Sequence, residues 1–363
     1  MTGSSLLADA VERFFGERCT PDDVAAAEAG GDTTKLWTAT EALGLTLASV
    51  PEDFGGGGGS LMDAMTILRA AGRHAVPVPL AETILAGWLL SEGGLTVEPG
   101  PCTVAPVRPR DRLSIVRHGA GWRLSGQARN VPWARAATSI AVVAIDDDCC
   151  SHVARVDPAA VVIEPGANLA LEARDVVTFN DVTLKPGNCA PLPGSHDTLL
   201  AHGALARATM MLGALEGARD LAIAHAKART QFGRPIAKFQ AVQQLIAQIA
   251  RDVAVTRAAV DLAIAAVTLD PATAWIEAAT AKTVAGSAAW EVSLRAHQVH
   301  GAIGVTKEYP LSILTRRLWS WRDEFGSGAE WSQRIGAQAW EAPGGPWGLA
   351  TSGPALATSA YAA

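Results

Sequence analysis

Two segments of the chain combine charged, amide and aromatic side chains with glycine, at positions where helix packing alone would call for apolar residues. They are RTQFGRPIAKFQAVQ, at 229–243, and HQVHGAIGVTKEYP, at 297–310. In the first segment, Arg229 stands where Gly233 and Pro235 break the helical pattern, so its guanidinium lies near a turn. Arginine offers a planar fork of donors that stays ionised, which suits an anionic group such as a pyrophosphate. The first segment is therefore a candidate anion-binding site.

The second segment places small residues where a backbone could approach a phosphate closely. Gly301 and Ala302 interrupt a helical pattern, and Gln298 lies one turn earlier. Small side chains at such a turn leave backbone N–H groups accessible to an anion. A glycine-containing turn between two core helices is the alternative explanation of the same pattern.

A third glycine-rich stretch, VPEDFGGGGGS at 50–60, lacks the lysine and Ser/Thr pattern of a nucleotide-binding loop. Five consecutive glycines cannot sustain a helix or a packed strand. We expect a plain loop at this place.

The elements that must position these segments fall into three regions. Residues 1–98 alternate apolar helical stretches with short breaks, which predicts a helical domain. Residues 99–192 carry short β-branched runs separated by Gly, Pro, Asn and Asp, which predicts a small antiparallel β domain. Residues 193–340 return to long helical periodicity rich in Ala, Leu, Gln and Arg, which predicts a helical bundle. Residues 341–363, rich in Pro, Gly, Ser and Ala, are expected to form a flexible tail.

Composition and charge exclude several classes of function for these 363 residues. The balance of 30 Lys+Arg against 36 Asp+Glu, a net charge of −6, gives no cationic surface for nucleic acid or an anionic membrane. The five cysteines are an odd number without metal-ligand spacing, so we expect free thiols in a reducing compartment and no metal site. The N-terminal pattern contains acidic residues, and the most apolar stretch is interrupted by Arg257 and Asp261. We therefore expect a cytoplasmic protein without an export signal or a membrane span.

The order of helices, β domain and helices, together with the two opening segments, resembles the acyl-CoA dehydrogenase family along nearly the whole chain. ALGLTLASVPEDFGG at 42–56 and VVTFNDVTLKPGN at 176–188 are also similar to parts of that family. The resemblance implies an α+β fold with an N-terminal helical domain, a middle antiparallel β domain and a C-terminal helical bundle. It also implies FAD as the cofactor. Because the family's dinucleotide lies across a subunit boundary, it implies a dimer or a tetramer.

The resemblance assigns cofactor-binding positions within the two segments. Those of the first segment are Arg229, Gln231, Phe232, Phe239 and Gln240. Those of the second segment, which resembles the part that another subunit offers to the same dinucleotide, are Gln298, Val299, His300, Gly301 and Ala302. The EYP motif that ends at Pro310 keeps the family's spacing.

Family members desaturate an acyl-CoA thioester with a carboxylate base, which removes the α proton while the β hydride passes to the flavin. The resemblance places that base at Phe325 or at Gly203, and neither residue can accept a proton. Glu324 lies one residue away, and a one-residue loop shift would bring it into play as the catalytic base. The β-domain motifs that contact the flavin ring are also replaced, by APVRPRD at 105–111 and ARNVPWARAA at 128–137.

Three hypotheses follow from these matches and departures. In the first, the chain is the partner subunit of a mixed α2β2 assembly, in which a second acyl-CoA dehydrogenase subunit supplies the base and the flavin-ring contacts. The motif changes resemble those of noncatalytic subunits from steroid and bile-acid side-chain degradation. In the second, the chain is a self-sufficient homo-oligomeric dehydrogenase with Glu324 as base. In the third, it is a flavin-free scaffold. For an enzyme of this family, electron-transfer flavoprotein is the expected electron acceptor, and the acyl chain is not fixed by the sequence.

Overall fold

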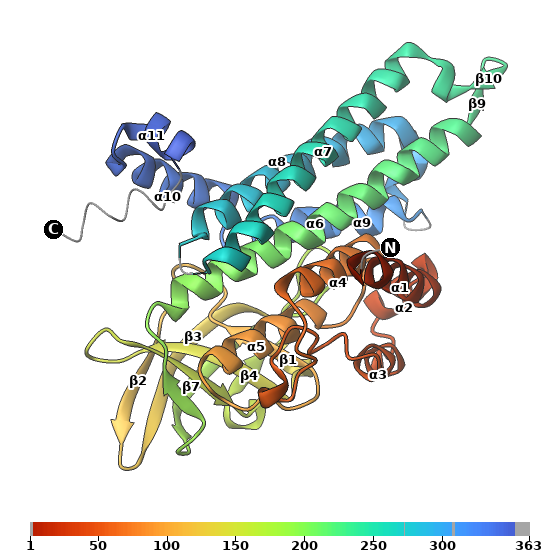
Figure 1. Ribbon diagram of the computed structural model, residues 1–363. Coiled ribbons are helices and arrows are strands. Elements are labelled where there is room, and N and C mark those ends of the chain that lie inside the picture. Colours follow the sequence, from red (N-terminus) through yellow and green to blue (C-terminus); the bar gives the residue numbers. More distant parts are fainter. Residues whose placement is uncertain (1–2, 272, 307–308, 353–363) are drawn as a thin grey trace.

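The computed structural model describes residues 3–271, 273–306 and 309–352, and it has three parts. Helices near the N-terminus and a β-sheet domain lie against one end of a bundle of long helices (Figure 1). The bundle extends away from both, and a small hairpin forms its far tip (Figure 1). This arrangement confirms the predicted α+β fold with helical, β and helical regions in that order.

The N-terminal helices begin where the sequence carries capping signals. Ser60 and Asp63 form a capping box at the start of α4, since each side chain receives a backbone N–H of the other residue. The elements of this part are α1 (Gly3–Arg18), α2 (Pro21–Glu28), α3 (Thr34–Ala42), η1 (Glu52–Phe54), α4 (Leu61–Arg73) and α5 (Leu80–Glu92). The glycine loop before α4 is a plain loop, because the N–H groups of Gly56 to Gly59 donate to carbonyls of residues 47–51.

The sheet domain contains β1 (Cys102–Ala105), β2 (Leu113–His118), β3 (Gly121–Pro132), β4 (Ser139–Ile145), β5 (Ser151–Val156), β6 (Val162–Glu164), β7 (Arg174–Leu184) and β8 (Cys189–Pro191). The strands follow the order β6-β7-β3-β2-β4-β5-β8, and β1 pairs with β4. The pairs are antiparallel as predicted, except that β1 and β2 each run parallel to β4. Two short turns, η2 (Ala134–Ala136) and η3 (Pro158–Ala160), connect strands. The sheet has an apolar core of its own, and buried residues of β1, β4 and β5 also belong to the core of the helices.

The C-terminal bundle is built on α6 (Ser195–Ala228), α7 (Gln240–Leu269) and α8 (Trp275–His300). At the tip, β9 (Thr230–Gln231), β10 (Arg234–Pro235) and η4 (Ile236–Lys238) connect α6 to α7 (Figure 1). After α8 come η5 (Gly301–Val305), α9 (Leu311–Trp321), α10 (Gly328–Glu341) and α11 (Gly345–Ser352). Part of the predicted flexible tail is thus helical, and the rest of that tail, 353–363, lies outside the described residues.

Helix α6 is the central helix of the molecule. Among the described helices it alone is long and apolar enough to cross a membrane, but 94% of its most apolar window is buried inside the protein. Its crossing with α4 is close because glycine occupies both sides of the contact. A Cβ at Gly72 would lie 2.0 Å from the carbonyl oxygen of Met210, and one at Gly213 would lie 1.9 Å from that of Arg69. The N-terminal helices are therefore fixed tightly to the bundle.

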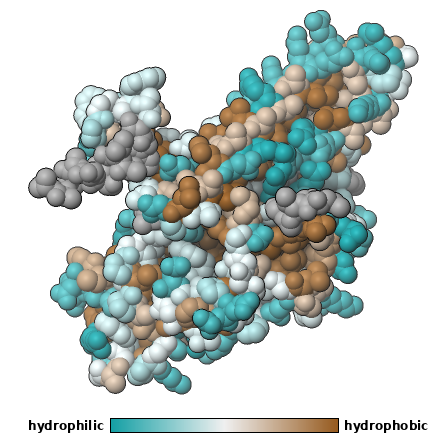
Figure 2. All heavy atoms as spheres, in the orientation of Figure 1, coloured by the Kyte–Doolittle hydropathy of each residue, from teal (hydrophilic) through white to brown (hydrophobic). Residues whose placement is uncertain are grey.

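The surface of the long helices mixes hydrophilic residues with scattered hydrophobic ones on the face that Figure 2 shows. All five cysteines are free in the structure, as the sequence predicted.

Candidate functional site

The turn between α9 and α10 carries the candidate base. Phe325 and Gly326 both have positive φ angles, 53° and 91°, and the Ser327 hydroxyl caps α10 by accepting the Glu330 N–H at 3.3 Å. The buried ammonium of Lys282, on α8, donates to the carbonyls of Arg322 (2.5 Å) and Gly326 (2.9 Å). Burial lowers the pKa of Lys282 to about 7. These contacts fix the turn and the position of its side chains.

The carboxylate of Glu324 is held by two guanidinium groups. Its Oε1 accepts from Nε of Arg174 at 2.7 Å, and its Oε2 accepts from Nε of Arg207 at 2.7 Å. Burial by itself would raise the pKa of Glu324, but the charges and hydrogen bonds of Arg174 and Arg207 outweigh it and lower the pKa to about 2. A carboxylate stabilised in this way is a poor proton acceptor near neutral pH. The structure therefore argues against the catalytic role that the sequence proposed for Glu324.

The two positions at which the resemblance places a base lie against each other. A Cβ at Gly203, on α6, would lie 2.0 Å from Cδ1 of Phe325. The ring of Phe325 is 1% exposed and lies beneath the guanidinium of Arg207, whose Cζ is 5.5 Å from the ring centroid. The residues at the two base positions therefore depend on each other. The phenyl ring of Phe325 occupies space that only a glycine at position 203 leaves free.

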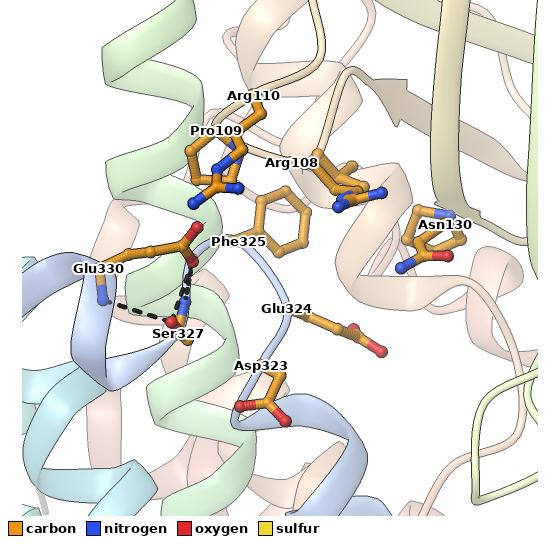
Figure 3. Close-up of a pocket in the computed structure, with 12 residues that line it drawn as sticks. Arg108, Pro109, Arg110, Asn130, Asp323, Glu324, Phe325, Ser327 and Glu330 are labelled. Carbon is orange, nitrogen blue, oxygen red and sulfur yellow. Dashed lines mark hydrogen bonds between the residues drawn. The ribbon is translucent and has the colours of Figure 1, made fainter.

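A pocket of about 520 Å³ opens beside this turn, between the sheet domain and the bundle (Figure 3). Its sheet-side wall includes Arg108 and Arg110, from the β1–β2 loop, and Asn130. Asn130 has a φ of 56° and lies where the β3–β7 register shifts between Ala128 and Val131. The opposite wall is the turn that carries Phe325. The replaced β-domain motifs therefore line this pocket, with charged side chains.

Glu324 belongs to a chain of buried ion pairs that joins the three parts of the molecule. Arg207 also pairs with Glu82 of α5, and Arg174 pairs with Glu172 at 2.9 Å. Glu172 also accepts a hydrogen bond from the indole N–H of Trp321. Arg317, on α9, forms ion pairs with Glu172 at 3.3 Å and with Glu28 of α2 at 2.6 Å. No local pattern in the sequence predicts that these residues pair with one another. The partners of Glu324 are 150 and 117 positions away.

The first segment, 229–243, lies at the exposed tip of the bundle (Figure 1). Arg229 ends α6, and among the described residues no hydrogen bond or ion pair occupies its guanidinium. Gln231 and Gln240 are also exposed. Phe232 is 90% exposed with a φ of 50°, and it meets the half-buried ring of Phe239 edge to face at 6.2 Å. The tip thus presents Arg229, two amides and two aromatic rings to the outside, together with the exposed cations Arg234 and Lys238.

The second segment ends α8 beside this tip. The ring of His300 lies 4.5 Å from that of His225, one turn before Arg229, so both segments gather at one end of the bundle. Gln298, Gly301 and Ala302 are exposed. Gly301 has a φ of 66° and open space where a Cβ would lie, which leaves its backbone accessible.

Two predicted residues of this segment face inward. Val299 and His300 are each 6% exposed. Nδ1 of His300 lies 2.7 Å from the Ala296 carbonyl oxygen, and Nε2 lies 3.1 Å from the Tyr309 hydroxyl. Their side chains therefore serve packing, and a bound group would meet their exposed neighbours instead. Glu308 of the EYP motif lies outside the described residues.

Comparison with known proteins gives one family for both helical parts. Residues 3–95 match the acyl-CoA dehydrogenase N-terminal domain, and residues 195–339 match the acyl-CoA dehydrogenase C-terminal domain. The chain is 28% identical to acyl-CoA dehydrogenase IpdE2 of Mycolicibacterium smegmatis, over 92% of this chain and 97% of the relative.

Two solved structures are similar over most of their length. The ChsE4-ChsE5 complex of Mycobacterium tuberculosis contains a chain with a TM-score of 0.87 and 24% identity, which covers 94% of this chain and 99% of that one. A variant of the Tcur3481-Tcur3483 steroid ACAD has a TM-score of 0.84 and 27% identity, and covers 92% of this chain and 96% of that one.

Proposed function

The chain belongs to the acyl-CoA dehydrogenase family, and from that premise we propose that it is the partner subunit of a heteromeric, FAD-dependent acyl-CoA dehydrogenase. In this role it contributes the contacts to the dinucleotide end of FAD. A second chain of the family contributes the carboxylate base and the contacts to the flavin ring. The substrate is an acyl-CoA thioester.

One observation carries this proposal: both segments keep exposed groups that suit a dinucleotide, whereas neither base position holds a carboxylate. The free guanidinium of Arg229 and the open backbone at Gly301 fit an anionic pyrophosphate. The contact of Phe325 with Gly203 leaves no carboxylate at either base position, and Glu324 is neutralised by two arginines. A self-sufficient enzyme would need a free base, and a flavin-free scaffold would have no use for the accessible cation.

Our proposal for the acyl group rests on a relative rather than on the pocket. The Tcur3481-Tcur3483 relative is described as a steroid ACAD, and this supports our proposal of a steroid-derived acyl-CoA. Bound FAD would supply the acceptor for the β hydride. The five free thiols support a reducing, cytoplasmic location, and electron-transfer flavoprotein is the acceptor that we propose for the assembly.

The test is reconstitution with a second acyl-CoA dehydrogenase chain from the same organism. Purified alone, this chain should be colourless and inactive. Co-purified with its companion, it should give a yellow complex whose flavin absorbance bleaches anaerobically on addition of a steroid-side-chain acyl-CoA. Turnover by the isolated chain would instead favour the self-sufficient enzyme. A complex without flavin, or no complex at all, would contradict the proposal.

The contribution of this chain to cofactor binding can be measured within the complex. Arg229→Ala removes the donor to the pyrophosphate, so FAD should dissociate about 10- to 100-fold more readily while the complex stays assembled. Arg251→Ala is the matched control, because that arginine is also exposed but lies within α7, away from the tip. FAD content and affinity are read by absorbance and by fluorescence titration. Equal FAD affinity in the two variants would exclude the role of Arg229.

A further inference from the structure

The pocket beside the α9–α10 turn has donors on its sheet-side wall that lack acceptors. Arg108 and Arg110 line the pocket from the β1–β2 loop, and neither guanidinium has a hydrogen bond or an ion pair within the described ranges. The side-chain amide of Asn130, on the same wall, is exposed and likewise unpaired in that part of the chain. Two guanidinium groups and an amide at one pocket are donors that a bound anion can use.

Two carboxylates that line the same pocket already have cationic partners. Glu324 is held by its two buried arginines, and Asp323 pairs at the surface with the adjacent Arg322 at 3.5 Å. These groups leave the pocket with no negative charge that is free to pair with the sheet-side wall.

The third carboxylate, Glu330, takes its hydrogen bonds from Ser327. Its Oε2 accepts the N–H at 2.9 Å and the hydroxyl at 3.0 Å. The backbone hydrogen bond of Ser327 is the main cause that lowers the pKa of Glu330, and the charges of Arg110 and Arg108 add to it only from a distance. Neither arginine is paired with this carboxylate, so the sheet-side wall keeps its positive charge.

The β1–β2 loop is braced, so that it holds its arginines in place. Nη1 of Arg112 donates to the carbonyls of Pro109 (2.5 Å) and Asp111 (3.0 Å). The same nitrogen lies 3.0 Å from Nε2 of His196, at the start of α6. Oδ2 of Asp111 accepts the N–H of Arg129, on β3, at 2.8 Å. A loop that is ordered before binding costs a ligand less entropy.

The arrangement of the two arginines favours a ligand with two separated charges. In the view of Figure 3, the guanidinium groups of Arg108 and Arg110 lie on opposite sides of the Phe325 ring. Phe325 and Val107, 1% and 4% exposed, add apolar surface to the lining. Two carboxylates joined by a short aliphatic chain match two cations and an apolar lining. An isoalloxazine ring is uncharged when oxidised and would leave both guanidinium groups unpaired.

We propose that this pocket binds a short dicarboxylate, with one carboxylate on Arg108 and the other on Arg110. The pocket in this chain is thus an anion-binding site rather than a place for the flavin ring. The proposal goes beyond the proposed function and does not depend on it, because the ligand binds to residues of this chain alone. Since both ion pairs form at a partly exposed wall, high salt should weaken binding.

The test titrates the full-length chain with succinate, its monoamide succinamate and its diamide succinamide, by calorimetry at low salt. Succinate should bind at least about 10-fold more tightly than succinamate, and succinamide should bind most weakly, because each amide removes one charge-assisted pair. Arg108→Gln and Arg110→Gln should each weaken succinate binding at least about 10-fold and remove most of the preference for succinate over succinamate.

Arg13→Gln is the matched control, because Arg13 is exposed on α1 and unpaired among the described residues. It removes the same charge and should leave succinate binding unchanged. Thermal unfolding without ligand shows that each variant is folded, and titration of the reconstituted complex repeats the comparison with this chain in its assembly.

Three results would overturn the proposal. The first is equal binding, or no binding, of succinate and succinamide. The second is succinate binding that both arginine variants retain. The third is riboflavin that competes with succinate and binds more tightly, which would assign the pocket to the flavin ring. Failure of reconstitution would contradict the proposed function and leave the dicarboxylate site in place.

Discussion

Glu324 binds two arginine side chains at once, and this double pairing decides what the residue can do. Arg174 and Arg207 are 5% and 1% exposed, so neither can be satisfied by water if the carboxylate is lost. Removing one partner of a buried ion pair leaves an uncompensated charge, whereas removing a general base affects only the chemical step. The two roles therefore predict different measurements.

We expect Glu324→Gln to lower the free energy of unfolding by about 3–5 kcal/mol and to leave the turnover of the assembled complex unchanged. Urea denaturation and turnover per bound flavin measure the two effects. Asp323→Asn is the control. The Asp323 carboxylate is next to Glu324 in the sequence, but it is exposed and should contribute little to the free energy of unfolding. A large loss of turnover with normal stability would restore Glu324 as the base.

The same residue predicts an acid dependence. Its pKa in the folded chain, about 2, lies below its ordinary value of 4.5. The unfolded chain therefore binds the proton first, and the stabilisation is present above pH 4.5 and is lost as the pH falls from there toward 2. Glu324→Gln should lack this part of the acid-induced loss.

The turn between α9 and α10 is a small rigid unit. Lys282 donates to two of its carbonyls, and the turn ends at Ser327, whose hydroxyl caps α10 by accepting the Glu330 N–H. The positive φ of Phe325 is maintained by these contacts and by the space that Gly203 leaves. The turn therefore keeps a conformation that a free loop would not favour.

Lys282 makes this turn sensitive to pH. Its pKa is about 7 in the folded chain and 10.5 ordinarily, so between these values the unfolded state binds one more proton. Stability should therefore rise with pH from 7 to 9, with a contribution of up to about 1.4 kcal/mol per pH unit. Lys282→Met should lack that slope, and Lys227→Met, at an exposed site, should retain it. Denaturation at several pH values measures the slopes, and identical slopes in both variants would refute the assignment.

Buried ion pairs join the three parts of the molecule, and none of the parts could bury these charges alone. Glu82 comes from the N-terminal helices, Arg174 from the sheet, and Arg207 from the bundle. A buried carboxylate or guanidinium is costly without its partner, so the parts must come together for the charges to be paired. We expect the three parts to unfold as one cooperative unit.

Arg207→Met should lower the free energy of unfolding by about 3–5 kcal/mol, because Glu82 and Glu324 are left buried without their shared cation. Arg219→Met, which removes a surface pair with the adjacent Asp220, should cost less than about 1 kcal/mol. Tryptophan fluorescence during urea unfolding measures both values. A double-mutant cycle with Glu82→Gln should show coupling of about 1–3 kcal/mol, and additive effects would contradict a shared ion pair.

The sequence predicted the kind and order of the elements and the free thiols, because helical periodicity, strand runs and turn residues act between near neighbours. It also showed that Phe325 and Gly203 cannot supply a base. The folded structure was needed to show that Phe325 packs into the space that Gly203 leaves, and that Glu324 belongs to an ion-pair chain. Sequence distance explains why. The partners of Glu324 lie 150 and 117 positions away, and the packing of three separate parts, rather than any local pattern, brings them together.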